Sequence, residues 1–292
     1  MMDNIDYHIK KIDDVILTHL EENHVSKTIM EASKYSIKSG GKRFRPYLLF
    51  AVLDAFGVPL DTGLKTAGAI EMIHTYSLIH DDLPAMDDDD LRRGNPTNHK
   101  IFGEAAAILA GDNLLTESFN LIANDRKLST ADKLALIQMI SKSAGQNGMI
   151  SGQMLDIEAE NNEISFEELE QIHSYKTGKL ISAPVKAASI IADADEKTDF
   201  HLLKFADHLG IIFQIRDDIL DVTGDVKLTG KNIGSDARKD KVTYVSTFGL
   251  DGAMEQMNRR VCLAKKELES VNDVLNIDEL KNVLNKFAVR DN

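Results

Sequence analysis

Cysteine, tryptophan and long apolar runs are scarce or absent in this sequence, and each absence limits what the protein can be. The 292 residues include a single cysteine, Cys262, and no tryptophan, so no disulfide bond can form within the chain. A chain without disulfides is typical of a reducing compartment, and we therefore expect a cytoplasmic protein. The first residues do not have the basic and then apolar pattern of a signal peptide, and no apolar run predicts a membrane span.

Positive charge is also in deficit, and this excludes some classes of partner. The chain has 34 lysine and arginine residues against 47 aspartate and glutamate residues, which gives a formal net charge of −13. Nucleic acids select a net basic surface, so we expect no nucleic-acid partner. A small anionic ligand remains compatible with this charge, because a few basic side chains in a pocket can outweigh the net sign.

The alternating pattern of β-strands is nearly missing, and most segments have the period of a helix. Only the isolated stretch KVTYV at 241–245 has the composition of a strand. Thr130 and Ser165 are expected to cap helices, the latter with Glu168 in a capping box. Because no linker rich in proline, serine or glycine divides the chain, we predict one all-α domain over residues 1–292. The predicted helices cover residues 3–22, 27–38, 44–56, 62–83, 103–123, 130–159, 165–192, 198–223 and, with an interruption, 252–288.

An acidic stripe lies in IIFQIRDDILDV, residues 211–222. Spacings of three and four residues place its polar side chains on one face of a helix, and apolar residues surround most of that helix. A solvated acidic surface is the alternative, but a largely buried helix would leave Asp217 and Asp221 repelling each other in a low dielectric. Bound cations would relieve this cost, so the stripe favours a metal site. The polar residues of the stripe are Gln214, Asp217, Asp218 and Asp221.

A second acidic cluster lies where another helix is expected to end. Pro84 lacks a backbone donor and should end that helix near residues 82–83. A chain that leaves the helix there can bring Asp87 or Asp88 back toward Asp81. The alternative is a flexible acidic loop on the surface. The residues that share one side of the helix are Glu71, His74, Asp81 and Asp82.

The chemistry of both clusters favours magnesium over zinc. Carboxylate oxygens suit Mg²⁺, which keeps several waters and shares phosphate ligands, whereas zinc prefers cysteine and histidine. Basic residues stand near both clusters, beside glycines and aspartates, and this setting favours diphosphate binding over scattered surface charge. These basic residues are Lys42, Arg43 and Arg45 in SGGKRFRP, Arg92 and Arg93 after the first cluster, Lys176 in YKTGK, Lys231 in TGKN, and Lys241.

Several motifs follow one another along the chain. They are GGKRFRP at 40–46, DDLPAMD at 81–87, LRRG at 91–94, GQMLD at 152–156, KTG at 176–178 and FQIRDDILD at 213–221. In this order they resemble the trans-prenyl diphosphate synthase family, and most closely its bacterial farnesyl diphosphate synthases. The resemblance covers nearly the whole chain. It implies an isoprenoid synthase fold, a single large helical bundle around a central cavity, usually as a homodimer, with the two aspartate motifs facing each other.

The resemblance also implies a role for each motif. Three Mg²⁺ ions would bridge the protein and an allylic diphosphate, and the metal ligands together with Arg92, Lys176 and Lys231 would drive the departure of that diphosphate. The implied metal ligands are Asp81, Asp82, Asp87, Asp217, Asp218 and Asp221. The implied ligands of the allylic diphosphate are Arg92, Lys176 and Lys231, with Lys241, Thr177 and Gln214 beside them. The implied ligands of isopentenyl diphosphate are Lys42, Arg45, His74 and Arg93.

The activity that the resemblance implies is the condensation of isopentenyl diphosphate with dimethylallyl diphosphate and then geranyl diphosphate, which yields farnesyl diphosphate. Tyr76 lies about 7.5 Å before Asp81 along a helix, and the resemblance makes Tyr76, with Ser77, the stop that limits product length. Ordinary core packing is the alternative role for Tyr76. The alternatives for the protein are a geranylgeranyl or geranyl diphosphate synthase, or a non-catalytic partner subunit, which should have degraded aspartate motifs.

Overall fold

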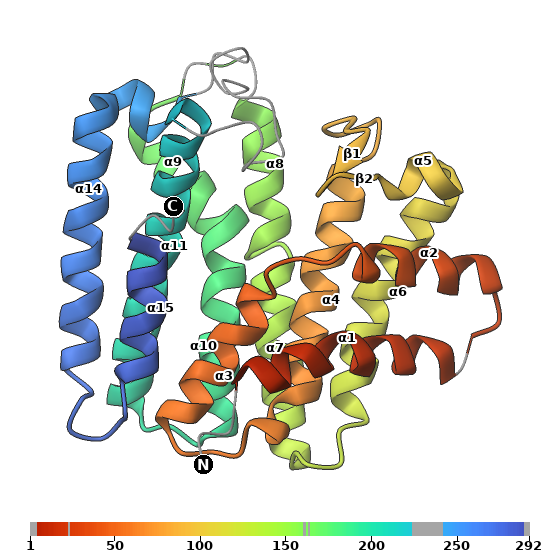
Figure 1. Ribbon diagram of the computed structural model, residues 1–292, viewed down its shortest axis with the longest axis horizontal. Coiled ribbons are helices and arrows are strands. Elements are labelled where there is room, and N and C mark those ends of the chain that lie inside the picture. The colour runs from red at the N-terminus through yellow and green to blue at the C-terminus, as the bar shows by residue number, and fades with distance from the viewer. Residues whose placement is uncertain (1–4, 23, 160–161, 163, 224–241, 289–292) are drawn as a thin grey trace. The chain divides into compact units, whose positions relative to one another are not determined.

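The computed structural model describes residues 5–22, 24–159, 162, 164–223 and 242–288, which are almost entirely helical (Figure 1). The prediction of an all-α protein is confirmed. Contacts group the chain into two compact units, unit 1 of residues 1–53 and 58–138 and unit 2 of residues 54–57 and 139–292. In the described part of the chain, no helix combines the length and the apolar character that crossing a membrane requires.

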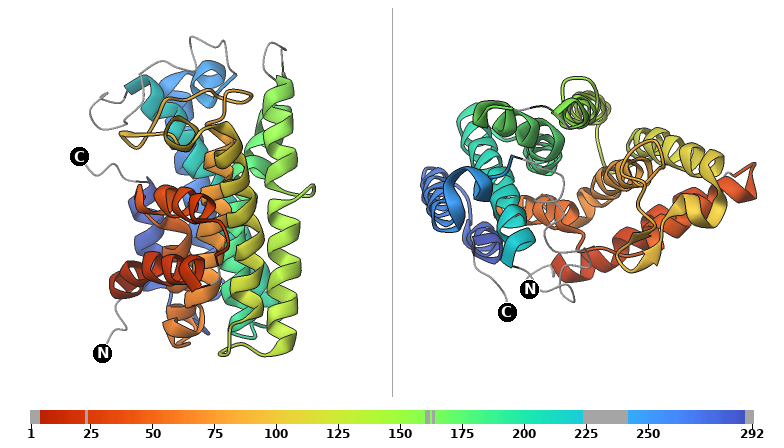
Figure 2. Two further views of the ribbon diagram at one scale, coloured as in Figure 1. Left: turned by 90° about the vertical axis from the view of Figure 1, so that its right-hand side faces the viewer. Right: turned by 90° about the horizontal axis from the view of Figure 1, so that it is seen from above.

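Unit 1 contains the N-terminal helices and a small hairpin. Its elements are α1 (Ile5–Glu22), α2 (Lys27–Lys38), most of α3 (Phe44–Ala55), the short 3-10 turn η1 (Leu60–Thr62), α4 (Leu64–Asp81), β1 (Leu91–Arg92), β2 (Asn95–Pro96), α5 (Asn98–Phe102), α6 (Glu104–Ala123) and the start of α7 (Thr130–Ala144). Helices α4 and α6 run side by side (Figure 2), and α1 and α2 cross them (Figure 1). Helix α4 is buried on most sides, as expected for a helix at the centre of a unit.

Unit 2 contains the C-terminal helices. Its elements are the end of α7, α8 (Met149–Ala159), α9 (Phe166–His173), the π-helical turn η2 (Ser174–Gly178), α10 (Lys179–Ile191), α11 (Glu196–Thr223), α14 (Tyr244–Glu269) and α15 (Asp278–Ala288). Helix α11 packs against α10, α14 and α15 (Figure 1). Ile215 of α11 forms a buried cluster with Tyr244 and Ala253 of α14, which fixes the start of α14 against the acidic stripe of α11.

Of the two expected helix caps, one is confirmed and one is wrong. The capping box at Ser165 is confirmed, because the Glu168 N–H donates to Ser165 Oγ at 3.2 Å and the Ser165 N–H donates to Glu168 Oε2 at 2.8 Å. The cap predicted at Thr130 is wrong by one residue. The Asp132 N–H donates to Ser129 Oγ at 3.1 Å, so Ser129 caps α7 and Thr130 is its first residue.

Three predicted segments differ from the structure in their interiors. The helix expected over 130–159 is two helices, α7 and α8, and the helix expected over 165–192 contains the π-helical turn η2. The strand composition at 241–245 is misleading, because Tyr244 begins α14 and Thr243 caps it. The hairpin of β1 and β2 and the short helix α5 were not predicted at all.

Candidate active site

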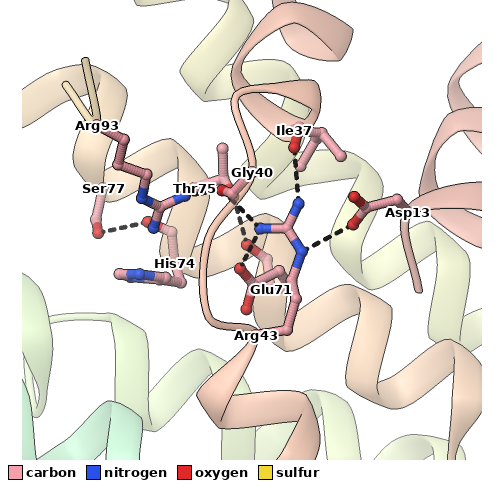
Figure 3. Close-up of polar contacts among 9 residues, drawn as sticks. All are labelled: Asp13, Ile37, Gly40, Arg43, Glu71, His74, Thr75, Ser77 and Arg93. Carbon is pink, nitrogen blue, oxygen red and sulfur yellow. Dashed lines mark hydrogen bonds and ion pairs between the residues drawn. The ribbon is translucent and has the colours of Figure 1, made fainter. Parts of the chain in front are cut away.

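A buried arginine, Arg43, ties together three segments of unit 1 (Figure 3). Its side chain is enclosed, with 6% of the residue exposed. The guanidinium donates from Nε to Asp13 Oδ1 at 2.8 Å, and from Nη1 to Glu71 Oε1 at 2.9 Å and to the Gly40 carbonyl at 3.0 Å. Nη2 donates to the Ile37 carbonyl at 2.7 Å. Arg43 therefore joins α1, α4 and the end of α2 together with the loop that leads to α3.

That loop has an unusual backbone. Gly40 and Gly41 have φ of 80° and 143°, and Arg43 has φ of 47°, in the left-handed region that costs a non-glycine residue about 1 kcal/mol or more. A Cβ on Gly41 would occupy the position of the Arg93 guanidinium, so a larger residue there would push this head group away. Glycine at position 41 therefore allows Arg93 to reach the loop.

Arg93 reaches the loop from the hairpin. β1 and β2 pair antiparallel, with Leu91 opposite Pro96 and Arg92 opposite Asn95. The two residues between the strands, Arg93 and Gly94, have φ of 55° and 78°, as a type I′ turn requires. Arg93 Nη1 donates to the carbonyl of Gly40. The hairpin thus separates two neighbouring arginines, because Arg93 binds the α2–α3 loop while Arg92 binds the end of α4.

Arg45, His74 and Arg93 form a cationic cluster in unit 1. Arg45 Nε is buried and has no hydrogen-bond partner within the described residues, and burial lowers the pKa of Arg45 to about 10. Burial, together with the positive charges of Arg45 and Arg93, holds the pKa of His74 well below its usual range. Glu71, 2% exposed, is the acid that opposes these effects at Arg45, and Lys42 is exposed on the adjacent loop. An excess of positive charge around an unpaired donor suits an anion.

The first aspartate motif folds back on the end of α4. The helix ends at Asp81, and the Asp87 N–H donates to the Asp81 carbonyl at 2.9 Å. The Asp88 N–H donates to the Leu83 carbonyl at 3.2 Å. The prediction that Pro84 ends the helix and that Asp87 returns toward Asp81 is confirmed.

Buried Asp82 and partly buried Arg92 form an ion pair beside this turn. Asp82 is 3% exposed, and its Oδ1 accepts from Arg92 Nε at 2.6 Å and lies 2.5 Å from Arg92 Nη2. Burial raises the pKa of Asp82, and the bond from Arg92 offsets only part of this effect. Arg92 Nη2 also lies 3.4 Å from Asp89 Oδ2. A residue expected to bind metal and a residue expected to bind diphosphate are therefore paired with each other.

In unit 2, Lys176 lies in the π-helical turn η2, and such turns are frequent at functional sites. Its Nζ donates to Asp156 Oδ2 at 2.7 Å. A Cβ on Gly152 of α8 would clash with the Lys176 backbone, so the motif GQMLD at 152–156 packs directly on KTG at 176–178. Thr177 lies in the same turn and is partly buried. Sequence reasoning assigned no role to Asp156, although its motif had been singled out.

The acidic stripe of α11 is less buried than expected. Asp217 is exposed, Asp221 and Gln214 are partly buried, and only Asp218, 7% exposed, is enclosed. Asp218 Oδ2 accepts from the Tyr244 N–H at 2.8 Å. Asp218 therefore holds the first residue of α14, a function that the sequence did not indicate.

Tyr244 extends this link to α9. Its hydroxyl donates to Glu170 Oε1 at 2.8 Å, and Arg260 Nη2 donates to the same oxygen at 2.7 Å. Burial, followed by the bond to Glu170, raises the pKa of Tyr244 far above its usual range. Tyr244 lies in KVTYV, whose composition is typical of a strand and does not indicate the start of a helix.

The metal-binding potential of the site lies in its carboxylates. In the described ranges, no group of three or more histidine, cysteine, aspartate or glutamate side chains is arranged to hold a metal ion. Magnesium does not need such a cage, because it is commonly held by one or two carboxylates and by substrate phosphates. The hard oxygen donors of both aspartate motifs fit that ion. Lys231 and Lys241, expected beside the diphosphate, lie outside the described residues.

Tyr76 lies on α4, before Asp81. It is 4% exposed, and its hydroxyl is buried without a hydrogen-bond partner among the described residues. Burial, with a further effect of Asp81, raises the pKa of Tyr76 to about 12. The ring packs edge to face on His80, with centroids 5.7 Å apart. Ser77 Oγ donates to the His74 carbonyl at 2.9 Å.

Comparison with known proteins identifies related sequences. A family model described as polyprenyl synthetase matches residues 26–280. The farnesyl diphosphate synthase of Bacillus subtilis (strain 168) is 46% identical over 284 residues, which cover 97% of this chain and 95% of that protein. The geranylgeranyl diphosphate synthase of Cyanophora paradoxa is 43% identical over 242 residues, 82% of this chain and 81% of that protein.

Solved structures of prenyl-transferring enzymes are also similar to this chain. A geranyltransferase from Helicobacter pylori, in complex with magnesium and isoprenyl diphosphate, matches with a TM-score of 0.82. Its sequence is 33% identical, and the match covers 98% of this chain and 97% of that chain. The similarity therefore extends over the helices of both units.

Proposed function

Because the chain belongs to the polyprenyl synthetase family, we propose that it is a trans-prenyltransferase that makes farnesyl diphosphate. It condenses isopentenyl diphosphate with dimethylallyl diphosphate and then with geranyl diphosphate, acting as one catalytic domain over residues 1–292. The observation that carries this proposal is the cationic cluster of Arg45, His74 and Arg93, where Arg45 Nε is buried without a partner among the described residues. An anionic substrate would supply the missing acceptor.

The cationic cluster is the proposed site for the diphosphate of isopentenyl diphosphate. Arg45 and Arg93 supply charged donors, both act electrostatically on His74, and Lys42 is exposed on the neighbouring loop. Because the pKa of His74 is low, its imidazole is neutral before substrate binds. Glu71 is the main negative charge near Arg93, and it is already bonded to Arg43.

The allylic diphosphate would be bound by Arg92 and Lys176. Each is already paired with a carboxylate, Arg92 with Asp82 and Lys176 with Asp156, so their charged ends are held in defined positions. Thr177 and Gln214 are proposed to line the same site. Lys231 and Lys241 complete the proposed set from the segment that the structure does not describe.

Magnesium is the proposed cofactor, with three ions in each active site. The proposal is supported by the donor chemistry and by the Helicobacter pylori relative, whose structure is a complex with magnesium and isoprenyl diphosphate. When bound, Mg²⁺ would offset the negative charge of the diphosphate and make it a better leaving group. The proposed ligands are Asp81, Asp82, Asp87, Asp217, Asp218 and Asp221.

The proposed reaction needs no protein nucleophile. Arg92 and Lys176 would neutralise the allylic diphosphate as its carbon–oxygen bond breaks. The alkene of isopentenyl diphosphate, held through its own diphosphate on Arg45 and Arg93, forms the new carbon–carbon bond with the allylic carbon. The proton that the product loses passes to the departing diphosphate, so charge and atoms balance without any other reactant.

The activity can be tested by incubating the protein with isopentenyl diphosphate, dimethylallyl diphosphate and MgCl₂. We expect farnesyl diphosphate as the main product, detected by chromatography after phosphatase treatment, and no product when EDTA removes the metal. The Bacillus subtilis relative is the positive control. Absence of any condensation product under conditions where that enzyme is active would contradict the proposed function. A main product of twenty carbons would favour a geranylgeranyl diphosphate synthase, as the Cyanophora paradoxa relative suggests.

We propose that the protein acts as a cytoplasmic homodimer. The support for a second copy is a group of exposed apolar side chains on α5 and α6, where Ile101, Ile108 and Leu109 are 50%, 43% and 52% exposed. Exposed apolar side chains on two helices that contact each other are typical of a protein interface. The single cysteine, Cys262, supports a reducing compartment.

Light scattering after gel filtration should give a mass near twice that of the 32.4 kDa chain. The double variant Ile108→Lys/Leu109→Glu should shift the protein to a monomer, because it buries two charges in the proposed interface. Val274→Glu, at an apolar residue that is 66% exposed on another part of the chain, is the matched control. A wild-type protein that elutes as a monomer at micromolar concentration, or a double variant that remains a dimer, would contradict this interface.

A further inference from the structure

Arg43 has no role in the proposed reaction, yet it is the most extensively bonded side chain near the cationic cluster. All three of its nitrogens donate to protein acceptors: Asp13 on α1, Glu71 on α4, the Ile37 carbonyl at the end of α2, and the Gly40 carbonyl in the α2–α3 loop. A guanidinium used in this way is a structural link between segments rather than a substrate ligand.

The backbone of Arg43 connects this link to residues that are proposed to bind substrate. Lys42 precedes it directly, and the Arg43 carbonyl accepts from the Tyr47 N–H at 3.0 Å at the start of α3, whose first turn carries Arg45. The left-handed φ of 47° at Arg43 persists only if other contacts hold it. The four side-chain bonds of Arg43 are those contacts.

Arg43 is also connected to Arg93 through one shared acceptor. The carbonyl of Gly40 accepts from Arg43 Nη1 and from Arg93 Nη1 (Figure 3). A change in the position of Arg43 would therefore move the acceptor that holds the Arg93 head group. The three segments that present Lys42, Arg45 and Arg93 are thus linked through a single residue.

We propose that Arg43, held by Asp13 and Glu71, is a positioning residue that presets Lys42, Arg45 and Arg93 for the diphosphate of isopentenyl diphosphate. This inference rests on the proposed function of the cationic cluster. Asp13 and Glu71 act through geometry and not through their charge. Two negative charges beside an anion site would by themselves weaken anion binding. Removing the charge of Asp13 should therefore strengthen the binding of the diphosphate, whereas losing the position of Arg43 should weaken it.

Asp13 is the residue at which the two effects can be separated. Its side chain is 39% exposed and its bond to Arg43 is a single hydrogen bond, so its replacement should leave the protein folded. Asp13→Ala removes the charge and the acceptor, whereas Asp13→Asn removes the charge but keeps an oxygen that can accept from Arg43 Nε. Asp14→Ala, at the exposed next residue of α1, removes a charge without touching Arg43 and is the control.

The test measures KM for isopentenyl diphosphate at saturating geranyl diphosphate, and KM for geranyl diphosphate at saturating isopentenyl diphosphate. In Asp13→Ala we expect the KM for isopentenyl diphosphate to rise about tenfold, with the KM for geranyl diphosphate changed by less than about twofold. Asp13→Asn should restore both values to within about twofold of wild type, and Asp14→Ala should change neither. Thermal melting of each variant checks that it is folded.

A lower or unchanged KM for isopentenyl diphosphate in Asp13→Ala would overturn the inference, as would equal rises in both KM values or equal effects of Asp13→Ala and Asp13→Asn. Calorimetric titration with isopentenyl diphosphate alone separates this inference from the proposed function. Wild-type protein that binds this diphosphate no better than Asp13→Ala defeats the positioning role alone. Wild-type protein that neither binds it nor condenses it defeats the proposed function as well.

Discussion

Asp81→Asn should lower kcat for condensation by about a thousandfold while leaving the protein folded. A metal ion that stabilises the departing diphosphate would lower the barrier by about 4 kcal/mol, and each 1.36 kcal/mol is about tenfold in rate. Asn keeps the shape of Asp but removes the charge that a hard cation requires. The turn after α4 should survive, because the Asp87 N–H bonds to the backbone carbonyl of Asp81 and not to its side chain.

Asp217→Asn is the equivalent change in unit 2 and should have an effect of the same size. Asp217 is exposed on α11, and substitutions at exposed positions usually change stability by only a few tenths of a kcal/mol. Asp251→Asn, at an exposed aspartate of α14, gives the same change of charge outside the proposed site and should leave kcat unchanged. Steady-state rates with isopentenyl and geranyl diphosphate at saturating Mg²⁺ measure the effect, and circular dichroism checks the fold. A rate within threefold of wild type in either variant would remove that aspartate from the proposed metal site.

Helical periodicity predicted most of the helices, since a buried face recurs every 3.6 residues whatever the helix packs against. It failed where the irregularity is local. The helix predicted over 130–159 runs across Gly-Gln-Asn-Gly at 145–148, a breaker sequence that separates α7 from α8, so at this boundary the local signal was present in the sequence. The π-helical turn at Lys176 inserts one residue and changes the helical phase by about 100°, but α9 before it has only 8 residues, too few to define a phase from the sequence.

The hairpin at 91–96 shows a different limit. Its strands are two residues long, too short for an alternating pattern, and its turn places a non-glycine residue, Arg93, at a positive φ. The usual signal for such a turn is Asn-Gly or Asp-Gly, and Arg-Gly does not supply it. Without the hairpin, the sequence could not show that Arg92 and Arg93 bind different segments.

The candidate site was predictable as a set of residues but not as a set of pairs. Arg43 and Arg45 are two positions apart in one motif, and only burial and bonding separate the structural Arg43 from Arg45, whose Nε has no described partner. Asp156 and Tyr244 were missed for a related reason. Each acts through a contact with a residue at least 20 positions away, which no local pattern encodes.

Tyr76→Ala should lengthen the product from fifteen carbons to twenty or more. Tyr76 lies on α4 about 7.5 Å before Asp81, along the direction in which a chain would grow away from the first aspartate motif. The ring is 4% exposed and stacks edge to face on His80, whose Nε2 donates to the Ile108 carbonyl of α6 at 3.0 Å. The ring therefore packs on a side chain that is itself bonded to α6, and removal of the ring opens space for another five-carbon unit.

The hydroxyl of Tyr76 offers a matched control. It is buried with no hydrogen-bond partner among the described residues, so Tyr76→Phe removes nothing that the described fold uses and keeps the ring. We expect Tyr76→Phe to make the fifteen-carbon product at the wild-type rate. Tyr76→Ala will cost about 3–5 kcal/mol of stability through the cavity it creates, so melting temperature must be measured beside product length.

Products of the three proteins are compared by chromatography after incubation with geranyl diphosphate and excess isopentenyl diphosphate. A rise in products of twenty carbons or more in Tyr76→Ala, with Tyr76→Phe unchanged, assigns the limit to the ring. If Tyr76→Ala is folded and active but still stops at fifteen carbons, Tyr76 is a core residue and another side chain limits the product. If Tyr76→Phe also lengthens the product, the hydroxyl and not the ring sets the limit, and a ring-based stop is wrong.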